Sequence, residues 1–185
     1  MNRKNLRDTT WFYPDPPLQG LFYSKISIDF AGNFWLPLRG GLGYFHRKTG
    51  QMSCLFYRQG DPHSALPGDV ICHVADPHAP VLWVGTQNGL SRLDYARAGT
   101  EMTARPDSSL FAWRHYTEAE GLPDDRVQTL ALDSAGRVWL ATYNALCCLD
   151  PANGQLRQYP IGNHPIWGIE RNVAVWLDRR LAIAG

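Results

Sequence analysis

The sequence predicts an all-β fold of β-propeller blades, each with four antiparallel strands, in three clear blades and one partial blade. The first observation behind this prediction is an internal repeat, in which three segments carry a Trp followed by apolar residues at fixed distances. The second is composition, because the 185 residues include 17 Gly and 13 Pro and are 12% aromatic. Frequent turns and large rings are typical of many short strands rather than long helices.

The repeat is anchored on Trp35, Trp83 and Trp139, which lie 48 and 56 residues apart. A leucine follows each Trp by seven residues, and a second apolar residue follows it by ten. These followers are Leu42 and Phe45, Leu90 and Leu93, and Leu146 and Leu149. A four-stranded unit that recurs at about 45 residues is typical of a propeller blade. We therefore expect each Trp to lie on the second strand of its blade.

The first blade is predicted over about residues 18–60. Its Gly40-Gly41 pair provides a turn between the second and third strands. Pro37 follows Trp35 by two positions and cannot donate a ladder hydrogen bond, so the second strand is expected to be short or at an edge.

The second blade is predicted over about residues 66–116. Leu66-Pro67 lies 17 residues before Trp83, and Asn88-Gly89 is a strong hairpin signal between the second and third strands. The longer spacing to the next Trp comes mainly from residues 95–109, which we interpret as an inserted surface loop before the last strand.

The third blade, over about residues 122–160, shows the pattern most clearly. Its Leu122-Pro123 pair again lies 17 residues before the Trp, and Pro and Gly fall between the apolar runs. The four strands are predicted at 127–132, 138–142, 146–149 and 156–159.

A partial fourth blade is predicted over residues 161–185, with residues 1–17 as a possible contributor of one strand. This blade is predicted from Trp176, which lies within a strand-like run at 173–177. Closed propellers have roughly four to eight blades. Either four blades close through mixed terminal strands, or the ring is incomplete. An incomplete ring exposes apolar blade faces, so we expect self-association or a longer parent chain that completes the propeller.

Each repeat Trp is expected to fill the wedge between neighbouring blades. Burial of one such ring removes ~150–250 Å² from water, which contributes at most ~4–6 kcal/mol. Small residues lie two positions after two of the tryptophans, at Gly85 and Ala141. We expect them to allow close approach of the next blade.

Composition excludes several classes of protein. The formal net charge is +1, which disfavours nucleic-acid binding. No apolar run approaches the ~20 residues that a membrane helix needs, and we expect no secretory signal in this chain. The four cysteines form no CxxC pair, so we expect free thiols and no zinc site, metal or other cofactor. They are Cys54, Cys72, Cys147 and Cys148.

Several segments resemble the two-component regulator propeller repeat, and together the likeness spans about residues 18–160. They are 31–35 with Gly41-Leu42, 82–94, 121–127 and 133–142. The resemblance implies an extracytoplasmic, periplasmic sensor segment of a bacterial hybrid histidine kinase or diguanylate cyclase, which binds a ligand, often a glycan. This chain departs from the family plan in having few blades and no immunoglobulin-like module, membrane helix or kinase. Ala145 also replaces the Gly expected before Leu146.

A ligand site is predicted on the loops between second and third strands, which surround the channel mouth of a propeller. These loops present Arg39, Gln87, Tyr143 and Asn144. One guanidinium, two amides and one ring suit a small-molecule or oligosaccharide ligand.

Two other classes of function stay open, a protein-interaction scaffold and, with less support, a streptogramin-lyase-like enzyme. Such lyases favour an acid shortly after the Trp, where this chain has Leu38, Thr86 and Thr142. No convergent set of His and carboxylate residues is found, so we expect no catalytic residues and no enzyme activity.

The remaining polar residues are expected to have structural roles. Asp29, Asp133 and the Asp124-Asp125 pair are predicted to cap turns. His73 and His78 are five residues apart, but one lies in a predicted strand and the other in a turn, so we expect no metal pair.

Overall fold

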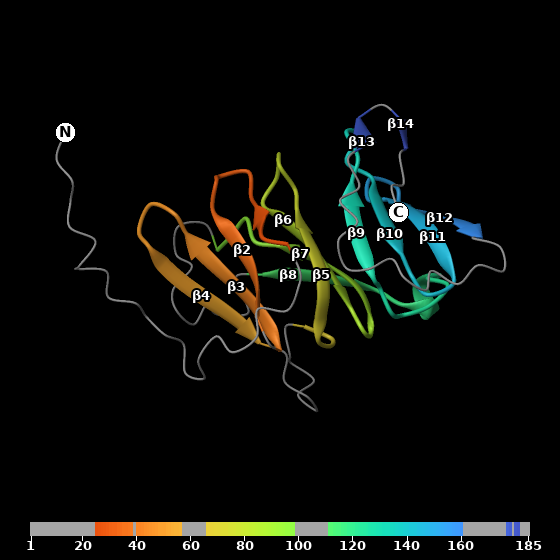
Figure 1. The fold of residues 1–185 in the computed structure, drawn as a ribbon, viewed down its shortest axis with the longest axis horizontal. Helices are drawn as coiled ribbons and strands as arrows, with labels where there is room; N and C mark the ends of the chain where they lie inside the picture. The colour runs from red at the N-terminus through yellow and green to blue at the C-terminus, as the bar shows by residue number, and fades with distance from the viewer. Residues whose placement is uncertain are drawn as a thin grey trace.

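The computed structural model describes residues 25–38, 40–56, 66–98, 111–160, 177–178 and 180–181. These residues form three four-stranded sheets, a short hairpin and one turn of 3-10 helix (Figure 1). Every strand pair is antiparallel. The prediction of an all-β fold with four-stranded antiparallel blades is confirmed.

Each sheet is a simple meander of consecutive strands. The first sheet contains β1 (Ser27–Ile28), β2 (Phe34–Leu38), β3 (Gly41–His46) and β4 (Gln51–Phe56). The second contains β5 (Val70–Ala75), β6 (Val81–Thr86), β7 (Gly89–Asp94) and β8 (Ala112–Tyr116). The third contains β9 (Thr129–Leu132), β10 (Val138–Ala141), β11 (Ala145–Asp150) and β12 (Gln155–Pro160). The helical turn is η4 (Glu118–Glu120), and the hairpin joins β13 (Leu177–Asp178) to β14 (Arg180–Leu181).

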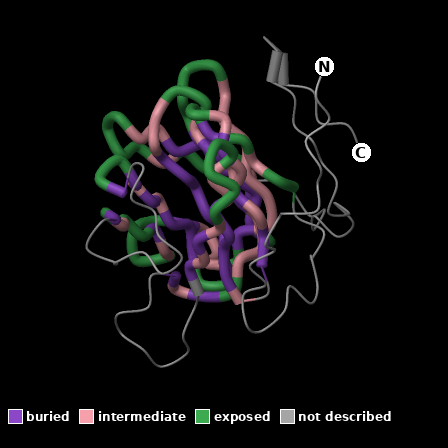
Figure 2. Tube along the Cα trace, turned by 90° about the vertical axis from the view of Figure 1, so that its left-hand side faces the viewer, coloured by how far each residue is buried: buried purple, intermediate pink, exposed green. Residues whose placement is uncertain are grey.

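The three sheets stack face to face, and the second lies between the other two (Figure 1). One apolar cluster joins the first sheet to the second, and another joins the second to the third. Figure 2 shows the buried residues running through the middle of the stack, with exposed residues in the turns. Burial between sheets is therefore the main source of stability.

The repeat tryptophans point in one direction along this stack. Trp35 lies in the cluster against the second sheet and is 0% exposed, and Trp83 lies in the cluster against the third sheet and is 1% exposed. Trp139 is only half-buried, so the prediction that every ring fills a wedge is wrong for this residue. The physical reason is that neither apolar cluster of the described residues covers the face of the third sheet on which Trp139 lies.

Gly85 allows the close approach predicted for it. A Cβ atom at this position would lie 2.7 Å from Cγ1 of Val127, a residue that enters the third sheet, and 2.5 Å from Sγ of Cys72. The backbone N–H of Val127 also donates to the Thr86 carbonyl at 3.1 Å. The sequence predicted that this strand begins at residue 127, but β9 begins at Thr129. The bond from Val127 to the neighbouring sheet explains the difference.

Two predictions for the first half of the chain need correction. The second strand of the first sheet is neither short nor an edge strand, because β2 has five residues and lies between β1 and β3. It tolerates Pro37 because β1 pairs only with Phe34 and Trp35, which leaves Pro37 beyond the end of β1. In the predicted insertion at 95–109, Tyr95 and Ala98 are buried in the core at 3% and 0% exposure.

Other expectations lie partly outside the described residues. The structure does not describe residues 1–17 or most of the strand predicted at 173–177. The limits of the blades remain predictions. All four cysteines are free, as expected, and burial raises the pKa of each thiol, to about 12 for Cys72. In the part of the chain that is described, no helix has the length and apolar character to cross a membrane.

Candidate functional site

The turns that follow the second strands lie at the same end of their sheets as the loops that enter the sheets. We call this end the turn rim and define it as residues 66–69, 86–89, 122–128 and 142–145. Backbone and amide hydrogen bonds join these segments. Asn88 Nδ2 donates to the Pro67 carbonyl at 2.8 Å, and the Gly89 N–H donates to the Asp125 carbonyl at 2.6 Å. The Gln128 N–H donates to the Ala141 carbonyl at 2.8 Å, directly before the fourth segment. The rim therefore extends across the second and third sheets.

Two buried threonines hold the rim turns in place. Thr86 Oγ1 accepts from the Asn88 N–H and donates to the Gly89 carbonyl, both at 3.0 Å. Thr142 Oγ1 donates to the Ala145 carbonyl at 3.3 Å. Both threonines are 0% exposed. Sequence reasoning missed this role, although a Thr three residues after the Trp in two repeats was the available signal.

Three of the four predicted ligand residues lie on these turns. Gln87 is exposed in the β6–β7 turn, and Asn144 is exposed beside Tyr143 in the β10–β11 turn. The Tyr143 side chain is 39% exposed. Arg39 lies outside the described residues. The structure thus places the amides and the phenol at one end of two neighbouring sheets, and the assignment of a ligand to them remains a prediction.

The paired carboxylates of the rim are used for backbone capping. Asp124 Oδ1 accepts from the Arg126 N–H, and Asp125 Oδ1 accepts from the Glu118 N–H, both at 2.7 Å. The capping role predicted for this pair is confirmed.

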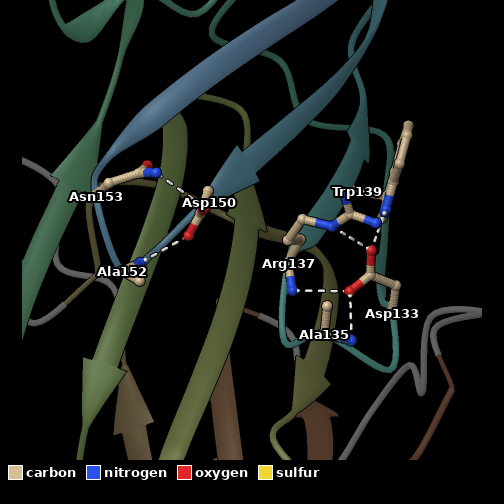
Figure 3. Close-up of polar contacts among 7 residues, drawn as sticks. All are labelled: Asp133, Ala135, Arg137, Trp139, Asp150, Ala152 and Asn153. Carbon is tan, nitrogen blue, oxygen red and sulfur yellow. Dashed lines mark hydrogen bonds and ion pairs between the residues drawn. The ribbon is translucent and has the colours of Figure 1, made fainter.

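The opposite end of the sheets is built by aspartates of the same kind. Asp133 Oδ1 accepts from the N–H groups of Ala135 at 2.9 Å and Arg137 at 3.0 Å (Figure 3). Its Oδ2 accepts from Arg137 Nε at 2.7 Å and Trp139 Nε1 at 3.0 Å. These donors hold the pKa of Asp133 below its ordinary value against the opposing effect of desolvation. The capping role predicted for Asp133 is confirmed.

Asp29 has the same role in the first sheet, where it is buried. Oδ1 accepts from the N–H groups of Ala31 and Asn33 at 2.9 and 2.8 Å. Oδ2 accepts from the phenols of Tyr44 and Tyr95 at 3.1 and 3.4 Å. Burial raises the pKa of both phenols, which therefore remain protonated donors. The cluster fixes the turn after β1 to the neighbouring sheet.

His73 and His78, five residues apart in the sequence, have different environments in the structure. His73 is buried, its Nε2 lies 3.2 Å from the Trp35 carbonyl, and desolvation lowers its pKa to about 4. His78 is exposed in the turn before β6. Across the described ranges, no group of three or more His, Cys, Asp or Glu is placed to bind a metal ion.

Comparison with known families gives one match. Residues 121–144 match the model described as the two component regulator propeller. This segment contains the Leu122-Pro123 pair, the Asp133 turn and Trp139. The resemblance seen in the sequence is thereby confirmed for the third repeat. No curated protein matches the chain.

Solved structures of similar fold include two extracellular domains from B. thetaiotaomicron. One belongs to a putative hybrid two component system, with TM-score 0.55, 22% identity, and coverage of 74% of this chain and 18% of that chain. The other belongs to a putative one component system, with TM-score 0.54, 17% identity, and coverage of 72% and 17%. A chain of the mitotic checkpoint complex also matches, with TM-score 0.52, 17% identity, and coverage of 81% and 38%.

These likenesses concern the fold, because a checkpoint protein and bacterial extracellular domains share it equally well. The matched region is less than a fifth of the length of the two bacterial chains.

Proposed function

We propose that this chain, which carries a two-component regulator propeller repeat, forms part of an extracytoplasmic sensor propeller and binds a small ligand at its turn rim. Binding, with no chemical conversion, is the proposed activity. The observation that supports it most directly is the match of residues 121–144, whose last residues, Tyr143 and Asn144, belong to the rim. The similar extracellular domains of B. thetaiotaomicron support the sensor role and the extracytoplasmic location.

The rim has properties that a binding surface needs. Its turns are held by Thr86 and Thr142, so little conformational entropy is lost when a ligand contacts them. Gln87 and Asn144 carry amides that both donate and accept hydrogen bonds. The ring of Tyr143 provides an apolar face beside a hydroxyl group. Amides beside a ring match the alternating hydroxyl groups and C–H faces of a sugar, so we propose a carbohydrate fragment as the ligand.

Calorimetric titration of the whole chain with a panel of neutral oligosaccharides tests this proposal. Tyr143→Ala and Asn144→Ala should each weaken binding at least tenfold, equivalent to ~1.4 kcal/mol. Phe30→Ala is the matched control, because Phe30 is a 49% exposed ring in the turn after β1, at the opposite end of the first sheet. Unchanged affinity in both rim variants would remove the rim from the site. Absence of any saccharide binding, together with a co-purifying polypeptide, would favour the scaffold function.

A further inference from the structure

The outward face of the third sheet carries the side chains with which the second sheet binds its neighbour. We call the face of each sheet that bears its repeat Trp the forward face. In the second sheet, Trp83 lies beside Tyr116 with ring centroids 6.1 Å apart, and the two side chains are 1% and 6% exposed. In the third sheet, Trp139 lies beside Tyr159 with centroids 5.7 Å apart. The same aromatic pair is therefore present on both forward faces.

Strand register shows that the two pairs are equivalent. The strand partner of Tyr116 is Leu90, and the strand partner of Tyr159 is Leu146; each leucine lies seven residues after its repeat Trp. Leu90 is fully buried, whereas Leu146 is half-buried. The forward face of the third sheet thus has the composition of an inter-sheet contact, but its Trp139 and Tyr159 belong to neither apolar cluster of the described residues.

Two aromatic rings of this face are only partly buried. Trp139 is half-buried and Tyr159 is 42% exposed. In the first sheet the forward positions are occupied by Trp35, Leu42 and Leu55, at 0%, 0% and 6% exposure under the second sheet. At both contacts between four-stranded sheets, the following sheet covers the forward face of the preceding one.

The opposite face of the first sheet is the complementary surface. We call the face that meets the preceding sheet the receiving face. In the second sheet it presents Leu82, Val84 and Leu93, each 0% exposed. In the first sheet the same register positions are taken by Phe34, Leu36 and Phe45.

These first-sheet residues lack such burial. Phe34, Leu36 and Phe45 are half-buried, and the rings of Phe34 and Phe45 lie 6.1 Å apart. Ile28, the strand partner of Phe34, is 60% exposed. Among the described residues, the stack therefore ends in a forward face on one side and a receiving face on the other that neither apolar cluster covers.

We propose that the forward face of the third sheet binds the receiving face of the first sheet in a second copy of this chain. Both contacts inside the chain join one forward face to one receiving face, which favours this head-to-tail pairing over contact between two like faces. The described residues of two copies supply twice three four-stranded sheets, or six, within the roughly four to eight blades of closed propellers. The closed ring has two identical contacts, and each strengthens the other by raising its effective concentration.

Sedimentation equilibrium of the full chain across micromolar concentrations tests the pairing. The wild type should approach twice 20.8 kDa, or 41.6 kDa. Tyr159→Asp on the forward face and Ile28→Asp on the receiving face should each give a monomer. Both side chains are well exposed, so the variants should keep the β-sheet circular dichroism of the wild type. Phe30→Asp, in an exposed turn, is the matched control and should remain a dimer.

Mixing the two monomeric variants provides the decisive measurement. Each retains one intact face, so an equimolar mixture should form a two-chain species through a single contact. Like-face pairing predicts that one variant alone still dimerises, and this result would overturn the head-to-tail proposal. A wild type that stays monomeric at all concentrations would also overturn it, whether or not the rim binds saccharides.

Discussion

At the scale of single residues, the buried carboxylate of Asp29 is the shared acceptor of a cluster of four hydrogen-bond donors. It accepts two backbone N–H groups in its turn and two phenols, one of them from Tyr95, 66 residues away in sequence. Asp76 caps an equivalent turn by accepting the N–H groups of His78 and Ala79 without bonds to phenols. Comparison of these two aspartates therefore separates the stability that comes from capping the turn from the stability that comes from the bonds to the phenols.

We expect Asp29→Ala to lower the free energy of unfolding by ~2–4 kcal/mol, because several buried donors lose their acceptor at once. Asp76→Ala, the matched control, should lower it by only ~1 kcal/mol. Urea unfolding followed by tryptophan fluorescence measures both. Equal losses in the two variants would show that the phenols add nothing to the role of Asp29.

A pH dependence follows from His73. Burial lowers its pKa to about 4 from 6.5, so the folded state binds fewer protons than the unfolded state between these values. Stability is therefore fully present above pH 6.5 and falls as the pH drops towards 4, by ~2–3 kcal/mol at pH 4.5.

The test compares urea midpoints at pH 7.5 and 4.5 in the wild type and His73→Gln. The variant should lose a large part of the pH dependence, whereas His78→Gln, at an exposed position, should retain it. An unchanged pH dependence in His73→Gln would contradict the assignment.

At the scale of strands and turns, the contact between Gly85 and Val127 limits how closely two sheets approach. Gly85→Val should lower the free energy of unfolding by ~1–3 kcal/mol, because added methyl groups overpack the interface. Val127→Ala in the same chain should recover part of the loss by making room. A double-mutant cycle in urea measures the recovery, and strict additivity would mean that the two residues act independently.

The sequence pattern was most informative for these elements. Predicted strands at 138–142, 146–149 and 156–159 correspond to β10, β11 and β12 with differences of one residue at the ends. The start of β9 was misplaced because Val127 bonds to a turn of another sheet, and local alternation carries no sign of that. The cluster of Asp29 and Tyr95 was missed for the same reason.

The candidate site was predicted less completely than the fold. Spacing from the Trp located the turns that carry Gln87 and Asn144, because strand length fixes where a hairpin turns. It did not identify the buried threonines that hold these turns. Their role depends on a side-chain hydrogen bond within each turn, and no periodic pattern encodes it.

At the scale of the whole molecule, association should be visible in thermal unfolding. If two copies close the ring, the melting temperature of the wild type should rise with protein concentration, because mass action favours the folded dimer. Tyr159→Asp should remove this dependence. Differential scanning calorimetry across a hundredfold range of concentration measures both, and a constant melting temperature in the wild type would contradict ring closure.

The common orientation of the tryptophans also bears on how such chains grow in evolution. Each four-stranded unit has a forward face and a receiving face that are complementary. A duplicated unit can therefore pack against both neighbours with the residues that it already has. Gain or loss of a unit then changes the size of the assembly without new interface residues, and repeat number can vary faster than the sequence of the contacts.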